Sequence, residues 1–111
     1  MDIHFNYQHV RASERLEAMA TEKLEELERR YSFITTGEVH FRAVNTEDNT
    51  TGMKTEFIIG VPGPQLFAES SGATFEESLS DTYNKIKRQL EKKKGEFIDA
   101  NRPSQPTEII Y

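Results

Sequence analysis

Residues 84–94 carry the side chains best suited to binding a polyanion. This short segment holds six cations and one acid, Glu91, so its local charge is +5. The whole chain has 14 lysines and arginines against 19 aspartates and glutamates, a net charge of −5 at pH 7. The local density of positive charge, rather than the net charge, decides whether a polyanion can bind. A solvated helix face, with a lysine-rich end that complements the helix dipole, is the alternative. The six cations are Lys85, Lys87, Arg88, Lys92, Lys93 and Lys94.

The segment lies on a predicted helix that begins after Thr74 and ends near Phe97. Thr74 and Glu77 have capping-box spacing, which satisfies two free amides at a helix start. Lys85, Arg88 and Lys92 form a ridge one turn apart, whereas Lys87 and Lys94 lie on the opposite flank and Lys93 points toward the apolar side. The apolar stripe that fixes these directions is Phe75, Leu79, Tyr83, Ile86, Leu90 and Phe97.

A second amphipathic helix is predicted from the N-cap Ser13 to about Tyr31. Lys23 and Arg30 lie together on one flank, and most of its six glutamates lie elsewhere. If the two helices pack side by side with the basic flanks facing outward together, they form one positive surface. Such a surface suits the phosphates of folded RNA, which proteins recognise largely by shape. The alternative is that these charges only pair locally and keep the domain soluble. The expected surface comprises Lys23, Arg30, Lys85, Arg88 and Lys92.

Alternating apolar and polar residues predict four strands, at residues 3–7, 39–43, 53–61 and 65–69. Thr36-Gly37 and Pro62-Gly63-Pro64 are predicted turns, 45–52 a polar loop, and 70–73 a connection. The element order is therefore β-α-β-β-β-α. The first strand joins the sheet through a crossover helix, so it pairs in parallel with the second. We predict an α+β two-layer sandwich, with a four-stranded sheet and both helices on one face. The open face carries His4, Asn6, His40 and Arg42.

Composition and motifs argue against an enzyme or a membrane protein. The 111 residues fit one domain, here residues 1–102, with a flexible tail at 103–111. The absence of cysteine excludes disulfides and thiol nucleophiles. His4 and His40 can meet on the open sheet face, but no acid completes a metal site. No glycine-rich phosphate loop, membrane span or signal peptide is present, so we expect a cytoplasmic protein with no cofactor.

Several runs together resemble the ribosome hibernation-promoting and ribosome-associated inhibitor family, whose members are also called sigma-modulation proteins. The runs are VPGPQLFAE at 61–69, TFEESL at 74–79 and IKRQLEK at 86–92, with ASE at 12–14 and EKLEEL at 22–27 in the first helix. No single run is diagnostic, but their order and the element order are specific together. The resemblance covers residues 2–97 and implies the same β-α-β-β-β-α fold.

The resemblance implies a non-enzymatic protein that binds the RNA of the small ribosomal subunit in the channel of messenger and transfer RNA. Family members stop translation there in stationary or starved cells. The family's RNA-contacting cations fall on Lys23, Lys85, Lys87, Arg88 and Lys92. Arg30 joins these candidates from its helix position alone. We expect a monomer off the ribosome that binds neither a membrane nor a small-molecule substrate.

Two features leave alternatives open. The chain ends soon after its second helix, so we expect a short form without the C-terminal domain that long members use to join two ribosomes. The sequence does not decide between promotion of ribosome dimers and silencing of single ribosomes. The acidic first helix offers another function, as a protein-binding regulatory module that acts, for example, on transcription.

Overall fold

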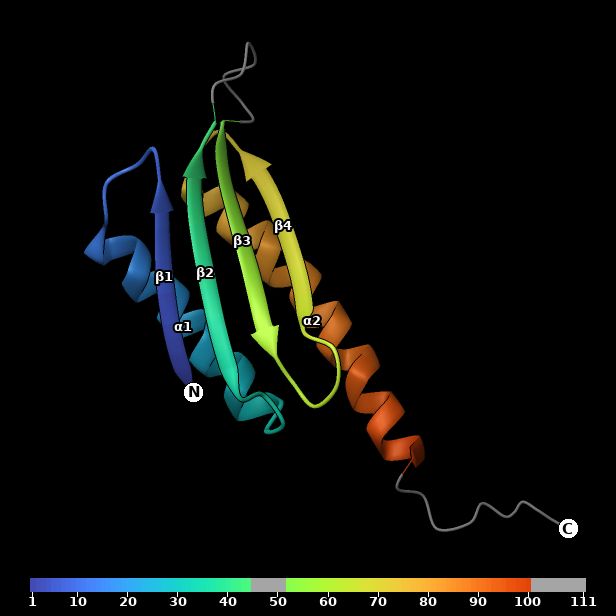
Figure 1. Ribbon diagram of the computed structural model, residues 1–111. Helices are drawn as coiled ribbons and strands as arrows, with labels where there is room; N and C mark the ends of the chain where they lie inside the picture. The colour runs from blue at the N-terminus through green and yellow to red at the C-terminus, as the bar shows by residue number, and fades with distance from the viewer. Residues whose placement is uncertain (45–51, 101–111) are drawn as a thin grey trace, which may run out of the picture.

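The computed structural model describes residues 1–44 and 52–100, which form one sheet covered by two helices (Figure 1). The elements are β1 (Asp2–Gln8), α1 (Glu14–Arg30), β2 (Thr36–Ala43), β3 (Met53–Gly60), β4 (Leu66–Gly72) and α2 (Phe75–Ala100). The strand order is β1-β2-β3-β4, with β1 parallel to β2 and the other neighbours antiparallel. The predicted element order and strand pairing are confirmed.

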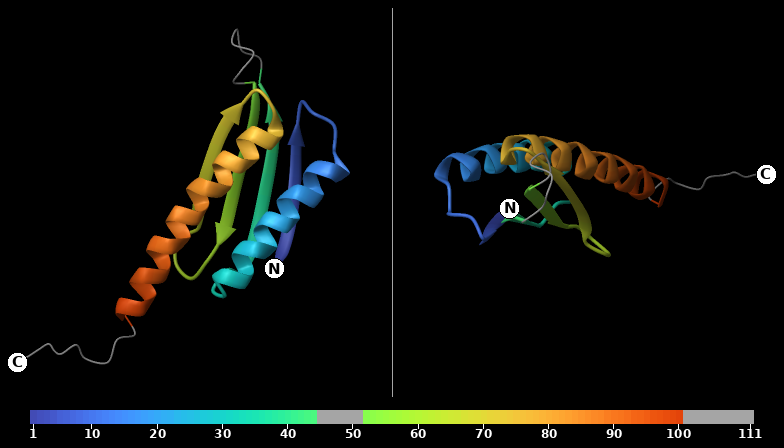
Figure 2. Two further views of the ribbon diagram at one scale, coloured as in Figure 1. Left: turned by 180° about the vertical axis from the view of Figure 1, so that it is seen from behind. Right: turned by 90° about the horizontal axis from the view of Figure 1, so that it is seen from above.

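Both helices lie on the same face of the sheet and run side by side (Figure 2). They point in the same direction, because Arg15 pairs with Glu76 near the two helix starts while Tyr31 bonds to Glu91 farther along. The predicted two-layer α+β sandwich is therefore correct. None of the described helices is long and apolar enough to cross a membrane.

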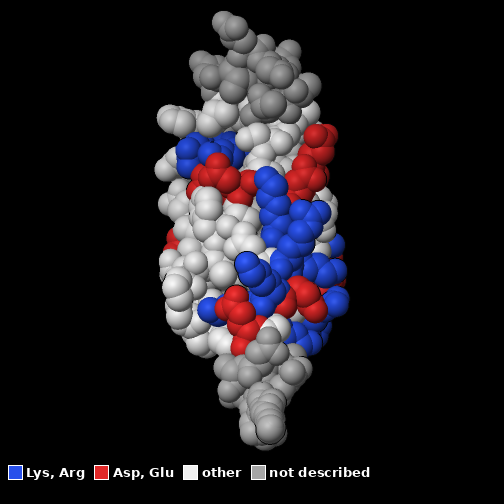
Figure 3. All heavy atoms as spheres, turned by 90° about the vertical axis from the view of Figure 1, so that its right-hand side faces the viewer, with Lys and Arg blue, Asp and Glu red and all other residues white. Residues whose placement is uncertain are grey.

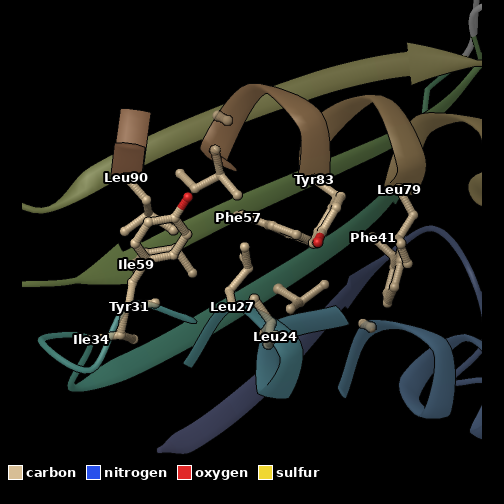
Figure 4. Close-up of a cluster of buried hydrophobic side chains, with 14 of the residues drawn as sticks. Leu24, Leu27, Tyr31, Ile34, Phe41, Phe57, Ile59, Leu79, Tyr83 and Leu90 are labelled. Carbon is tan, nitrogen blue, oxygen red and sulfur yellow. The ribbon is translucent and has the colours of Figure 1, made fainter. Parts of the chain in front are cut away.

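The core lies between the helices and the covered sheet face, and it fixes which way the charged residues point (Figure 4). In α2, Leu79 lies beside Phe41 at one end of the cluster and Leu90 lies near Tyr31 at the other, with Leu24 and Leu27 of α1 between them. These side chains are almost fully buried, and each such side chain contributes about 1.5–3 kcal/mol by leaving water. Since the apolar stripes face the sheet, most of the charged helix positions face solvent.

A buried polar contact also fixes α2 on the sheet. The hydroxyls of Thr55 and Ser78 lie 2.7 Å apart, and the Thr82 hydroxyl donates to the Thr55 carbonyl at 3.1 Å. All three residues are buried, so their hydrogen bonds avoid the cost of an unsatisfied polar group. They set the rotation of α2 over β3 and therefore the direction of its cations.

Element boundaries depart from the predictions at two points. The predicted turn Thr36-Gly37 is wrong, because both residues belong to β2 and pair with β1 and β3. A Cβ at Gly37 would lie 3.0 Å from the Met1 sulfur and 3.2 Å from a Leu24 methyl, so this glycine makes room under α1. The predicted connection at 70–73 is mostly strand, because Ser70 pairs with Thr55. The predicted loop at 45–52 and the tail at 103–111 lie almost wholly outside the described residues.

The open sheet face carries the four predicted polar residues, and two of them, His40 and Arg42, have acidic partners. His4 lies opposite Glu38 in the register, and His40 lies opposite Asn6, so the two histidines are not direct neighbours. His40 Nε2 is 2.9 Å from Glu38, and Arg42 pairs with Glu56. Within residues 1–44 and 52–100, no group of three or more histidines and acids could hold a metal ion.

Candidate nucleic-acid interface

Helix α2 begins where the sequence predicts and presents its cations outward. The Thr74 hydroxyl accepts a hydrogen bond from the Glu77 amide at 3.1 Å, which caps the first turn. Lys85, Arg88 and Lys92 are exposed, as expected for a ridge opposite the buried stripe. Figure 3 shows lysine and arginine side chains gathered in a band along this side of the molecule.

One flank of α2 is fastened to the edge strand β4. Lys85 Nζ donates to the Glu69 carbonyl at 2.8 Å, and the Gln89 amide donates to the Phe67 carbonyl at 2.7 Å. These donors stand one helical turn apart and reach carbonyls two residues apart on the strand. Lys92 lies one turn beyond Gln89 and lines a hollow of about 280 Å³ with residues of the β3–β4 turn. We call Lys85, Gln89 and Lys92 the β4 flank.

The other flank of α2 faces α1, and Tyr83 lies at the boundary between the two helices. Lys23 Nζ of α1 lies 5.0 Å from the centre of the Tyr83 ring, and Lys87 Nζ of α2 lies 5.9 Å from it. The Tyr83 hydroxyl donates to Glu26 at 2.5 Å, which links the two helices. An aromatic face attracts cations, so the ring favours the positions of both ammonium groups.

The same arrangement repeats two turns along, around Tyr31. Arg30 lies 5.8 Å from the centre of the Tyr31 ring and Lys94 lies 6.0 Å from it, while the Tyr31 hydroxyl donates to Glu91 at 2.5 Å. Beside Tyr31 is a hollow of about 260 Å³. It is lined by Arg30, Tyr31, Asn84, Lys87, Arg88 and Glu91. We call this hollow, together with Tyr83, Glu26 and the cations over both tyrosine rings, the groove.

The protonation states of the groove follow from these contacts. Burial, and then the hydrogen bond to Glu26, raises the pKa of Tyr83 to about 12. Burial likewise raises the pKa of Tyr31. The phenol hydrogen bonds lower the pKa of Glu26 and of Glu91, so both carboxylates are ionised at neutral pH. The groove therefore presents two carboxylates among its cations, each held by a neutral phenol.

The six predicted binding residues fall on two flanks rather than on the single surface expected from the helix wheel. Lys23 and Arg30 face Lys87, which the wheel had set apart from them. Lys85 and Lys92 lie on the β4 flank, and Arg88 lines hollows on both sides. The basic flank of α1 packs toward α2, so Lys23 lies beside Lys87 over the Tyr83 ring, and Arg88 connects this side with the β4 flank.

Sequence reasoning missed several residues of this region. The sequence predicts Tyr83 only as part of the apolar stripe and Tyr31 only as the end of the first helix, although a buried tyrosine usually finds a hydrogen-bond partner for its hydroxyl. Lys94 was placed on a flank but not among the binding candidates, and its position over Tyr31 adds it to the groove. No sequence signal identifies Asn84 or Gln89, because their roles depend on packing against α1 and β4. The predicted direction of Lys93 is confirmed: its side chain is mostly buried, with Nζ 5.3 Å from the Phe97 ring centre.

Comparison with known proteins identifies the family. Residues 3–97 match the family model described as Sigma 54 modulation protein / S30EA ribosomal protein. The chain belongs to this family. The resemblance noted from the sequence is thereby confirmed, and the family is one of ribosome-associated modulation factors. No curated protein sequence matches the chain.

Solved structures with the same fold carry related descriptions. A ribosomal subunit interface protein from Coxiella burnetii matches with a TM-score of 0.74 and 19% identity, covering 86% of this chain and 99% of that one. The N-terminal domain of Protein Y from Thermus thermophilus matches with a TM-score of 0.70 and 15% identity, covering 83% of this chain and 98% of that one. At these identities the likeness establishes the shared fold.

Proposed function

We propose that the protein binds the RNA of the small ribosomal subunit in the channel of messenger and transfer RNA, and blocks both during stationary phase or starvation. The observation that carries this proposal is the gathering of cations along one helix pair in a chain of net charge −5. The proposed contacts are Lys23, Arg30, Lys85, Lys87, Arg88 and Lys92. In this proposal the protein acts in the cytoplasm, without catalysis and without a cofactor.

The two flanks of α2 suit a rigid contact with folded RNA. Lys23 and Lys87 lie over one aromatic ring, so their ammonium groups are already ordered before RNA arrives. Lys85 is also held, by its bond to β4. Ordered cations lose less conformational entropy on binding than free ones. The two flanks of α2 can therefore bind RNA phosphates at the same time, and Arg88 lies between the two flanks.

Translation in a purified system tests the mode of action. A protein seated in the channel competes with messenger and transfer RNA, so inhibition should saturate near one protein per ribosome. Prior loading of messenger and transfer RNA should reduce the inhibition. Inhibition at amounts far below the ribosome concentration would indicate catalysis and contradict the proposal. Tight binding that leaves messenger and transfer RNA occupancy unchanged would place the protein elsewhere on the ribosome.

Charge reversal tests the site. The triple variant Lys85→Glu, Arg88→Glu and Lys92→Glu should weaken binding to small subunits at least about a hundredfold, because it removes three phosphate contacts and adds repulsion. The single variants Lys92→Glu and Arg11→Glu form a matched pair, since both side chains are exposed. Only the first should weaken binding. Equal effects of the two would show that general charge, rather than the α2 ridge, governs binding.

The acidic face of α1, on which the alternative function depends, has fewer free hydrogen-bond acceptors than the sequence suggests. Glu17 accepts a hydrogen bond from Tyr7, Glu26 one from Tyr83, and Glu28 pairs with the Met1 amino group. Digestion of lysate with ribonuclease separates the two functions. An RNA-bound protein should leave the ribosome fractions, whereas a protein-bound module should remain with its partner.

We also propose that residues 1–102 bind the ribosome as one unit and that the protein is a monomer off the ribosome. The β4 edge supports a monomer, because the bonds from Lys85 and Gln89 occupy two of its outward carbonyls. A strand edge covered in this way is a poor template for pairing with another chain.

A further inference from the structure

A second hollow lies between α2 and the end of β4, on the side of Arg88 away from the groove. Its volume is about 250 Å³, and every residue that lines it is polar. Four of these residues come from α2 at spacings of three and four, so they share one helix face. Two serines of β4 complete the wall. The lining residues are Ser70, Ser71, Asp81, Asn84, Lys85 and Arg88.

The side chains around this hollow have hydrogen-bonding capacity to spare. Asp81, Asn84 and Arg88 are exposed and take no part in the side-chain hydrogen bonds and ion pairs of residues 1–44 and 52–100. Lys85 uses one of its three donors on the Glu69 carbonyl. The Ser70 hydroxyl is buried, with only 8% of the residue exposed, and has no hydrogen-bond partner in the described part of the chain.

Asp81 decides which ligand fits. A carboxylate beside Lys85 and Arg88 repels a ligand that is purely anionic, and it lowers the affinity of the ridge for phosphate. It favours a ligand that brings a hydroxyl donor together with the anionic group. RNA offers that combination, because each ribose carries a 2′-hydroxyl beside its phosphate. DNA has the phosphate alone.

We propose that this hollow holds one ribose-phosphate unit of RNA. Lys85 and Arg88 contact the phosphate, and the Asp81 carboxylate accepts a hydrogen bond from the ribose 2′-hydroxyl. The inference rests on the proposed function, since it places RNA on the same ridge. It adds a contact that distinguishes RNA from DNA, in a protein whose other proposed contacts are to phosphate only.

The direction in which one substitution changes the affinity for small subunits separates this contact from general electrostatics. Asp81→Ala removes a negative charge beside a polyanion, so charge alone predicts tighter binding to purified small subunits. Loss of a hydrogen bond to a charged group instead predicts binding weakened about tenfold. Glu22→Ala is the matched control, because Glu22 is an exposed acid on α1 away from the hollow. It should leave affinity unchanged or slightly tighter. Thermal unfolding should confirm that both variants are folded.

A pair of probes tests the hydroxyl directly. An RNA hairpin is compared with the same hairpin carrying 2′-fluoro riboses, which keep the helical shape but lack the donor. The wild-type protein should bind the ribose form more tightly by about tenfold, and Asp81→Ala should bind both forms alike. Equal binding of both hairpins by the wild type would overturn the inference.

The outcomes also separate this inference from the proposed function. If Asp81→Ala tightens ribosome binding while Lys85→Glu and Arg88→Glu weaken it, the ribose contact is wrong and the ridge still binds phosphate. If the two charge reversals also leave ribosome affinity unchanged, the proposed site and the inference both fail.

Discussion

The salt dependence of ribosome binding, measured for single alanine variants, tests each proposed contact of the interface separately. Each phosphate neutralised by a lysine or arginine contributes about −0.7 to −0.9 to the slope of log affinity against log salt. Six contacts predict a slope of about −4 to −5, which corresponds to a loss of about a hundredfold in affinity between 0.1 M and 0.3 M salt. Replacing any one of the six proposed cations should reduce the slope by about 0.8.

The structure distinguishes Lys85 from Lys92 within this series. Lys85→Ala and Lys92→Ala should bring the slope closer to zero by the same amount, but Lys85→Ala also removes the hydrogen bond to the Glu69 carbonyl. That bond contributes about 0.5 kcal/mol to the free energy of unfolding, at the low end of the usual range because Lys85 is exposed. Lys92→Ala should leave that free energy unchanged.

The assay is equilibrium binding of labelled protein to small subunits at five or more salt concentrations, with urea unfolding measured in parallel. Arg11→Ala is the control and should leave the slope unchanged. A slope near −1 for the wild type, or slopes unaffected by substitution on either flank of α2, would refute the reasoning.

Three further predictions concern the elements that position the site. Tyr83→Phe should reduce the loss of stability at alkaline pH. Because the pKa of Tyr83 is raised to about 12, its contribution to the free energy of unfolding is complete below about pH 10 and disappears as pH rises through 12. Unfolding midpoints from pH 8 to 12 measure this, and parallel curves for both proteins would contradict it. The double variant Lys85→Ala and Gln89→Ala should self-associate with rising concentration in sedimentation equilibrium, because it uncovers the β4 edge, while Lys92→Ala stays monomeric. Gly37→Val should lower the free energy of unfolding by about 1–3 kcal/mol through crowding against Met1 and Leu24, whereas Gly95→Ala, with open space at its Cβ, should raise it by about 0.5–1 kcal/mol.

The fold could be predicted from the sequence because each element carries its own periodicity. The stripe of α2 from Phe75 to Leu90 is buried as expected, and the cap at Thr74 forms. Parallel pairing of β1 and β2 follows from the crossover helix between them. The errors occur where tertiary pairing overrides local composition. Gly37 has the local signal of a turn, but two neighbouring strands and the approach of α1 place it inside β2.

The candidate site could be predicted only in part, for a related reason. A helix wheel gives the direction of a side chain relative to its own helix, and it correctly separates Lys85 from Lys87. It does not give the rotation of α1 relative to α2. That rotation depends on which residues cross the boundary between the helices, among them Tyr83 bonded to Glu26 and Tyr31 bonded to Glu91. Lys23 therefore lies beside Lys87, in a groove that the sequence of neither helix shows.

The acids of the groove bear on how an acidic protein can bind RNA. Glu26 and Glu91 repel phosphate, but each holds a tyrosine whose ring keeps two cations in place. Removing either acid would raise the local potential and cost the tyrosine one hydrogen bond, although burial in the core still holds the ring. If order matters more than potential, Tyr83→Leu, which removes the ring itself and leaves the charges unchanged, should weaken ribosome binding, whereas Glu26→Gln, which keeps an acceptor for the phenol, should change it little. If potential alone governs binding, Glu26→Gln should tighten it and Tyr83→Leu should have no effect. Measured side by side at one salt concentration, the two variants show whether the groove binds RNA through its charge or through the positions at which its tyrosines hold that charge.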